Sequence, residues 1–255
     1  MIQTARPYHG SSMQIAEPTA SRLIAAIQQG GVEALEALLA ANPALSNGRI
    51  VDERGAQRTP LHIATDWPGH FPRVAATIGV LVRHGADVNA KMAGPHTETP
   101  LHWAASSGDL EAMDALLEAG ADMEATGAVI GGGTPLADAA AFAQWDCARR
   151  LLERGARANL WQAAAMGLLD HIEAAFSSVQ PPAPGEVTSA FWCACHGGRR
   201  TAAEYLLERG ADRDWIGYDR CTPLDAARRG GWNEVAAWLE SLNALAVQPI
   251  NPPNR

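Results

Sequence analysis

Lysine is almost absent from this chain of 255 residues: Lys91 is the only one, and the other 19 of the 20 lysine and arginine residues are arginines. The arginines come as scattered pairs, such as Arg149–Arg150 and Arg199–Arg200, and the formal net charge is −8. Phosphate binding needs a net or local basic field, so we expect no nucleic-acid partner. The preference for arginine and alanine over lysine suggests a GC-rich genome and a bacterial source.

Long apolar runs are also missing. No stretch approaches the roughly 18 apolar residues of a membrane span, and residues 1–17 hold no run that resembles a signal peptide. Four cysteines are present, Cys147, Cys193, Cys195 and Cys221, without Cys-x-x-Cys or zinc spacing. A chain of this length needs no disulfides to hold a core. We therefore expect buried free thiols, a cytoplasmic location, no membrane association, no metal and no cofactor.

Two short motifs recur in a fixed frame. The first reads Thr-Pro-Leu-His at 59–62 and 99–102, Thr-Pro-Leu-Ala at 134–137 and Thr-Pro-Leu-Asp at 222–225. The second is a Gly-Ala pair, followed by Asp at 87, 122 and 212 and by Arg at 157. Thr99 to Gly120 spans 21 residues, as does Thr134 to Gly155. Internal repetition of this kind indicates an array of similar units.

Each motif has a local structural meaning. Threonine is a good N-cap, and proline at the first helical position loses no hydrogen bond. We expect a helix over 100–107, a break at Gly108, and a second helix over about 110–119 that ends at Gly120. Neither helix is long enough to be stable alone, so each unit must stack on the next.

These motifs resemble the ankyrin repeat, whose T-P-L-H-x-A-A and L-L-x-x-G-A-D signatures they match. The resemblance covers roughly residues 21–244 and implies an all-α repeat solenoid of helix-turn-helix units joined by β-hairpin loops. We expect about seven units, with Ser21 as the first N-cap, between disordered tails at 1–20 and 245–255. The predicted units lie near 21–58, 59–98, 99–133, 134–157, 158–185, 186–221 and 222–244.

The array is irregular in three places. The second unit is five residues longer than the others, and the excess falls within residues 66–72, between its two helices. The loops before Thr99 and Thr134 are long, with tips at 94–98 and at Ile130-Gly-Gly-Gly133. The fifth unit has no hairpin and is followed by a proline-rich connector at 180–185. Insertions in repeat arrays map to loops that often form the binding face, so these irregularities direct attention to the N-terminal half.

The concave face of such an array is expected to expose fixed positions of each first helix. The residues predicted to face the groove include Ile63, Asp138, Gln162, Cys193 and Ala226. The residues two and three positions after the paired alanines are predicted to face it as well. Loop residues extend the rim. Candidate binding residues are Asp66, Trp67, His70, His96, Glu98, Trp103, Ser106, Phe142, Trp161, His196, Trp215 and Tyr218. Tryptophan, tyrosine and arginine are common anchors of protein interfaces.

His62 and His102 are the histidines of the two Thr-Pro-Leu-His motifs. In ankyrin repeats the histidine of this motif is structural and ties a hairpin to the neighbouring unit, so neither is expected to bind metal. Ala137 and Asp225 replace it in two units, which puts the bonding there in doubt.

Catalysis has little support in the sequence. Asp66, His70, His96 and Glu98 could converge for acid–base chemistry, and Cys193 shares a helix face with His196. The glycine run at 131–133 could cradle an anion, or form a flexible tip. Ankyrin arrays usually bind rather than catalyse. The main hypothesis is therefore a monomeric, non-catalytic module that binds another protein. The alternative is a small-molecule binder or an enzyme with a pocket between the second and third units.

Overall fold

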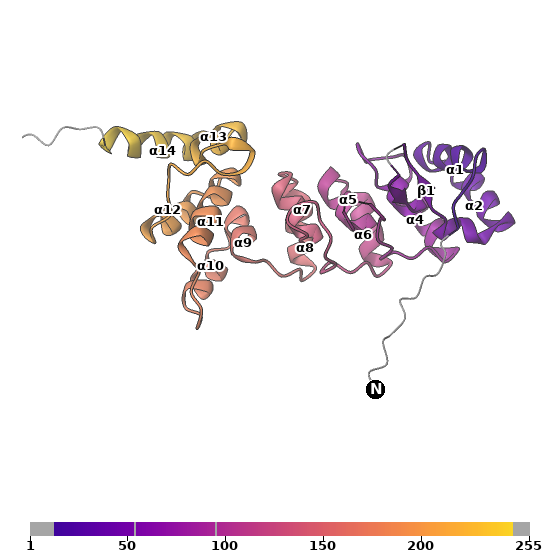
Figure 1. Ribbon diagram of the computed structural model, residues 1–255, viewed down its shortest axis with the longest axis horizontal. Helices are drawn as coiled ribbons and strands as arrows, with labels where there is room; N and C mark the ends of the chain where they lie inside the picture. The colour runs from indigo at the N-terminus through magenta and orange to yellow at the C-terminus, as the bar shows by residue number, and fades with distance from the viewer. Residues whose placement is uncertain (1–12, 54, 95, 247–255) are drawn as a thin grey trace, which may run out of the picture. The chain divides into compact units, whose positions relative to one another are not determined.

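The computed structural model describes residues 13–53, 55–94 and 96–246. Within them fourteen α-helices follow one another, and the fold class is the expected all-α repeat solenoid (Figure 1). Contacts between elements divide the chain into two compact units, unit 1 (Met1–Cys147) and unit 2 (Ala148–Arg255). Residues 1–12 and 247–255, which make up most of the two expected tails, lie outside the described residues.

Unit 1 is built from two rows of short helices. The first helices contact one another in chain order, α1 with α3, α3 with α5 and α5 with α7. The second helices do the same, α2 with α4 and α4 with α6. The helices are α1 (Thr19–Gln28), α2 (Val32–Ala41), α3 (Pro60–Ala64), α4 (Val74–Arg83), α5 (Pro100–Ser107), α6 (Leu110–Glu118) and α7 (Pro135–Ala141), and α8 (Trp145–Glu153) begins at the end of the unit.

The Thr-Pro-Leu-His motif explains where α3 and α5 begin. His62 is buried, and its Nδ1 accepts a hydrogen bond of 3.3 Å from the backbone N–H of Thr59. Its Nε2 lies 3.1 Å from the carbonyl oxygen of Glu98, to which it donates. His102 repeats this arrangement with Thr99 and with the carbonyl of Gly133, at 3.1 and 3.3 Å. The prediction that these histidines are structural and tie a hairpin to the neighbouring unit is confirmed.

The two replacements of that histidine behave differently. Asp225 accepts hydrogen bonds from the backbone N–H and the hydroxyl of Thr222, at 3.0 and 2.6 Å, so the cap of that helix survives. Ala137 has no polar group, and the buried hydroxyl oxygen of Thr134 has no hydrogen-bond partner among the described residues.

The N-terminal boundary differs from the prediction. The first helix begins at Thr19 and follows Pro18, so Ser21 lies inside α1 rather than at its N-cap. Residues 13–15 also belong to the folded unit, because Arg49 accepts from the N–H of Ile15 and donates to the carbonyl of Met13. Ile15 is buried, so the expected disordered tail does not extend to residue 20.

The insertion at 66–72 lies where the sequence placed it. It follows α3, which stops after one turn at Ala64, and it ends before α4. The α5–α6 break occurs at Gly108, whose φ of 77° is the left-handed conformation that glycine adopts without strain. Strands β1 (Ile50–Val51) and β2 (Gln57–Arg58) form an antiparallel hairpin, and Gln57 also bridges to Ala93 in the next loop.

An asparagine links consecutive turns of unit 1. Asn47 donates to the carbonyl of Gly85 and accepts at 2.8 Å from the backbone N–H of Asp87. One repeat later, Asn89 donates to the carbonyl of Gly120 at 3.4 Å. It also accepts from the N–H of Asp122 at 2.8 Å. Each of these Gly-Ala-Asp turns is therefore held by a side chain from the preceding repeat.

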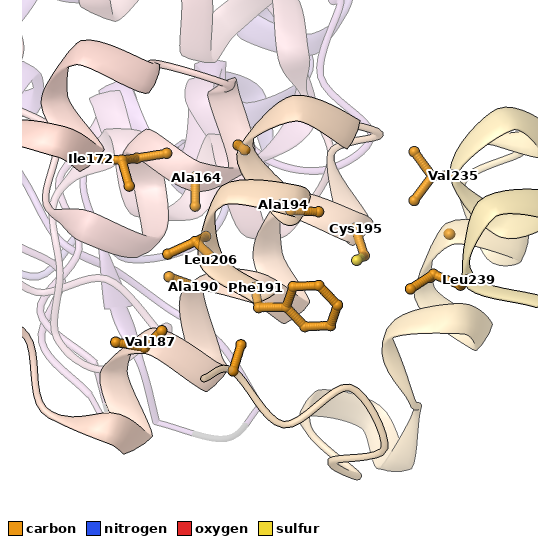
Figure 2. Close-up of a cluster of buried hydrophobic side chains, with 14 of the residues drawn as sticks. Ala164, Ile172, Val187, Ala190, Phe191, Ala194, Cys195, Leu206, Val235 and Leu239 are labelled. Carbon is orange, nitrogen blue, oxygen red and sulfur yellow. The ribbon is translucent and has the colours of Figure 1, made fainter. Parts of the chain in front are cut away.

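Unit 2 contains three helix pairs around an apolar core. Phe191 is fully buried, and Figure 2 shows its ring among the other side chains of the cluster, with Leu239 facing the same space. The α9–α11, α11–α12, α11–α13 and α13–α14 contacts surround this core. The helices are α9 (Leu160–Met166), α10 (Leu169–Phe176), α11 (Pro184–His196), α12 (Arg200–Glu208), α13 (Pro223–Arg229) and α14 (Asn233–Ala246).

The proline-rich connector is shorter than expected. Helix α11 begins at Pro184, so the last two residues of the predicted connector form its first turn. Proline suits this position, and Glu186 accepts a hydrogen bond of 2.8 Å from the N–H of Ala183. At the other end, α14 continues to Ala246, past the expected start of the C-terminal tail.

All four cysteines are buried free thiols, as predicted. None of the described helices is long and apolar enough to cross a membrane.

Candidate functional site

A pocket of about 250 Å³ opens on unit 1 between the insertion, α5 and α7. Three aromatic side chains form much of its wall. Trp67 stands on the insertion with 83% of its surface exposed, and Phe142 follows α7 with 48% exposed. Trp103 lies half-buried on α5. The lining consists of Thr65, Asp66, Trp67, Glu98, Trp103, Ser106, Val129 and Phe142. We call this the aromatic pocket.

Glu98 is the central polar group of the aromatic pocket. Its side chain is buried, and its Oε2 accepts a hydrogen bond of 3.1 Å from the indole Nε1 of Trp103. Its Oε1 accepts at 3.3 Å from the backbone N–H of Val129. The Trp103 ring meets the His62 ring edge-on, with centroids 5.1 Å apart and planes at 79°. Because His62 also binds the Glu98 carbonyl, both the backbone and the side chain of Glu98 are positioned.

Asp138 lies behind Glu98 and is fully buried on α7. Both of its carboxyl oxygens lie outside regular hydrogen-bond geometry with the described residues. Burial, and then the negative charge of the neighbouring Glu98, raise the pKa of Asp138 to about 8. At neutral pH Asp138 is therefore protonated and adds no charge beside Glu98.

Asp66 contributes no net charge to the pocket. Its Oδ2 lies 2.7 Å from Nη1 of Arg58, and its Oδ1 accepts from the backbone N–H of Trp67 at 2.9 Å. Partial burial raises the pKa of this carboxyl, and the Arg58 guanidinium opposes the rise. With Asp66 neutralised by Arg58, the Glu98–Asp138 pair provides the net charge of the pocket.

Six of the candidate residues meet at this pocket: Asp66, Trp67, Glu98, Trp103, Ser106 and Phe142. Thr65 and Val129 also line it and were not among the candidates. Val129 had an indirect signal, since it precedes the glycine-rich loop tip that the sequence singled out. Asp138 was expected on the groove surface, but it lies beneath the surface instead.

His70 and His96 do not join the pocket lining. The backbone N–H of His70 donates at 2.6 Å to Asp109, and the His70 ring is largely exposed, with Nδ1 4.0 Å from that carboxylate. His96 is half-buried in the loop before Glu98. Of the four residues considered for acid–base chemistry, Asp66 and Glu98 therefore meet at the pocket, and the two histidines do not join them.

Three candidate residues, His196, Trp215 and Tyr218, lie together in unit 2 around Trp192. The Trp192 ring stacks on His196 at 5.4 Å and meets Tyr218 edge-on at 5.1 Å. Tyr218 also meets Trp215 edge-on at 5.8 Å. Trp192 Nε1 donates at 2.9 Å to the carbonyl of Cys221, so this cluster is tied to the loop before α13. Trp161 lies half-buried on α9.

One helix position that was predicted to face the groove does not do so. The five residues predicted there are all buried: Ile63, Asp138, Gln162, Cys193 and Ala226. Gln162 illustrates the reason, because its side chain accepts at 2.9 Å from the N–H of Asn159 and so caps α9 from within. This position of the first helix thus serves packing and capping. Trp103 stands at the same position but is half-buried, since its indole reaches out to Glu98.

Two chemical alternatives lose support. Burial raises the pKa of the Cys193 thiol to about 12, which opposes formation of the thiolate nucleophile. In the loop tip, the N–H groups of Gly131, Gly132 and Gly133 all bond to carbonyls within the loop. The glycine run therefore folds on itself and does not present those N–H groups to an anion.

Comparison with known proteins gives two matches. A family model described as ankyrin repeats, in three copies, matches residues 74–161. A segment of 51 residues, 20% of this chain, is 39% identical to "Ankyrin repeat and KH domain-containing protein mask-1" of Caenorhabditis elegans. That segment spans 2% of the length of the nematode protein. The family match includes Glu98, Trp103 and Phe142, whereas Trp67 and the rest of the insertion precede it. Ankyrin repeats are generally protein–protein interaction modules and are typically non-catalytic.

Proposed function

We propose that this chain is an ankyrin-repeat protein and that it is a non-catalytic module that captures another protein through the aromatic pocket of unit 1, a proposal supported by the family match over residues 74–161. The observation that carries the proposal is the convergence of exposed Trp67 and Phe142 on one pocket. Exposed aromatic side chains at a concave site are the anchors from which protein interfaces draw most of their affinity.

The size of the pocket favours a protein side chain over a small molecule. Small-molecule and cofactor sites usually enclose about 300–1,000 Å³. The aromatic pocket, at about 250 Å³, lies below that range. It also lacks the converging histidines that the alternative hypothesis required. A partner that inserts one or two side chains here and spreads over the neighbouring loops would match the site.

The charge of the chain bears on the class of partner. With a net charge of −8 and an acidic pocket, we propose a protein partner and no nucleic acid. The four free thiols support a reducing, cytoplasmic setting. A monomeric state and a bacterial source remain predictions from the sequence.

Affinity purification from a source lysate followed by mass spectrometry tests the proposal. Trp67→Ala is the informative variant, because its exposed side chain can be removed without opening a core cavity. Ile216→Ala, which truncates an apolar side chain in unit 2 that is 66% exposed, is the matched control. We expect partners recovered with the wild type and with Ile216→Ala to be lost with Trp67→Ala. Identical partner sets from all three proteins would overturn the pocket assignment.

A further inference from the structure

The aromatic pocket joins flat aromatic walls to a buried carboxylate. We propose, building on the protein-binding function above, that it receives the side chain of an arginine from the partner. The guanidinium would stack against Trp67 or Phe142 and direct its N–H groups at Glu98. A planar cation is attracted to the face of an aromatic ring and pairs well with a carboxylate, so both kinds of wall favour the same group.

Charge complementarity separates arginine from an uncharged occupant. Arg58 neutralises Asp66 at 2.7 Å, while no basic side chain among the described residues pairs with Glu98. An ionised carboxylate has about four acceptor positions. Trp103 and Val129 occupy two of those on Glu98, one on each oxygen. A buried carboxylate with remaining acceptor capacity binds a charge-assisted donor more strongly than a neutral one.

The buried Asp138 adds a second property to the pocket. An arginine beside Glu98 would favour ionisation of Asp138, since a cation offsets the repulsion between the two carboxylates. Binding would then release a proton, and affinity would rise with pH up to and through about 8.

The other titratable groups near this pair are two buried histidines and three charged side chains. Burial lowers the pKa values of His62 and His102, so both rings are neutral there. Of the charged groups nearby, Arg58 is paired with Asp66, and the Lys91 ammonium donates to the carbonyl of Thr126. Asp138 is therefore the group whose ionisation would follow ligand binding.

The probe is a capped tripeptide, acetyl-Gly-Arg-Gly-amide, added to the full chain labelled with ¹⁵N. Its neutral counterpart contains citrulline in place of arginine, and a lysine tripeptide reports on a cation without a planar fork. The indole N–H signals of Trp67 and Trp103, assigned through Trp67→Phe and Trp103→Phe, report on the pocket. We expect saturable shifts with the arginine peptide and binding about fivefold weaker or more with the citrulline peptide.

Two variants locate the effect. Glu98→Gln keeps the shape of the side chain and should reduce arginine affinity to that of citrulline, whereas Glu118→Gln, an exposed site on α6, should leave affinity unchanged. Asp138→Asn should bind arginine but lose the rise of affinity between pH 6.5 and 9. Thermal melts of each variant show that the fold is retained.

The outcomes distinguish this inference from the proposed function. Equal binding of the arginine and citrulline peptides, with partner capture still lost in Trp67→Ala, would overturn the arginine inference alone. A second outcome is that the arginine peptide binds in a Glu98-dependent way while Trp67→Ala and Glu98→Gln leave partner capture unchanged. The pocket would then not bind the protein partner, and both proposals would be overturned. Shifts confined to indoles other than Trp67 and Trp103 would also refute the inference.

Discussion

The indole Nε1 of Trp103 donates a hydrogen bond of 3.1 Å to Oε2 of Glu98. This bond fixes an aromatic side chain of the pocket and its carboxylate in position relative to each other. Glu98 lies just before helix α5, and Trp103 lies on the first turn of that helix. The pocket is therefore preorganised on a rigid element, and ligand binding need not order these side chains.

Trp103→Phe removes the indole N–H and keeps an aromatic ring. We expect the free energy of unfolding to fall by about 1–3 kcal/mol, because the buried Glu98 carboxylate loses a donor. Urea denaturation measures this. Trp161→Phe is the control, since the Trp161 indole makes no hydrogen bond within the described residues. A loss of the same size in the control would show that the hydrogen bond to Glu98 contributes little.

His62 should make the stability of the protein depend on pH. Burial lowers its pKa from 6.5 to about 4 in the folded state, so the unfolded chain binds a proton more readily. The contribution of His62 is thus complete above pH 6.5 and is lost as the pH falls towards 4. Its size is about 3 kcal/mol, from the difference between the two pKa values.

The measurement for His62 compares wild type with His62→Gln by urea denaturation at several pH values between 4 and 7. Other groups, including carboxylates with lowered pKa values, act in both proteins and cancel in the difference. We expect the stability advantage of wild type over the variant to shrink as the pH falls. An advantage that is constant across this range would contradict the assignment.

Asp138 should make the stability of the protein depend on pH in the opposite direction to His62. The folded-state pKa of Asp138 is raised from 3.8 to about 8, so the folded protein holds a proton that the unfolded chain releases. The aspartate is therefore tolerated at low pH and becomes costly as the pH rises from 4 to 8. We expect Asp138→Asn to gain stability relative to wild type over that range, by at least about 1 kcal/mol. A relative stability that does not change with pH would exclude the raised pKa.

A pair of threonines tests what the motif histidine contributes. The Thr99 hydroxyl lies 2.9 Å from Nδ1 of His102, whereas the buried Thr134 hydroxyl has no partner in the described residues. We expect Thr99→Val to cost about 1–2 kcal/mol and Thr134→Val to be neutral or stabilising. Chemical denaturation of the two variants side by side measures the difference. Equal costs would mean that the histidine adds nothing to the cap.

The positions of most helices could be predicted from the sequence, because the residues that start and end a helix lie within or next to it. Helix α5 runs over 100–107 as expected, since a Thr-Pro start and a glycine stop bracket it. The insertion was also located, because the spacing between the two motifs is longer there. The start of α11 was missed, since Pro184 was read as part of a connector when it occupies the first turn of a helix.

The Glu98–Asp138 pair had no local signal. Glu98 lies in the loop before α5 and Asp138 lies on α7, and the helix position that leaves Trp103 half-buried on α5 buries Asp138 on α7. Asp138 is fully buried, with Glu98 and the backbone of Ile130 close to its carboxyl group. These neighbours come from other parts of the chain, so only the tertiary packing brings the two carboxyl groups together. The direction of a pKa shift at such a site cannot be predicted from residue type.

The asparagine links of unit 1 have a consequence for the history and the engineering of the array. Asn47 and Asn89 each recognise a Gly-Ala-Asp turn through its backbone, so either can hold any turn of that kind. A deletion or duplication of one whole period would bring an equivalent asparagine against an equivalent turn. Recombination between repeats could therefore lengthen or shorten this part of the chain without a new interface having to evolve.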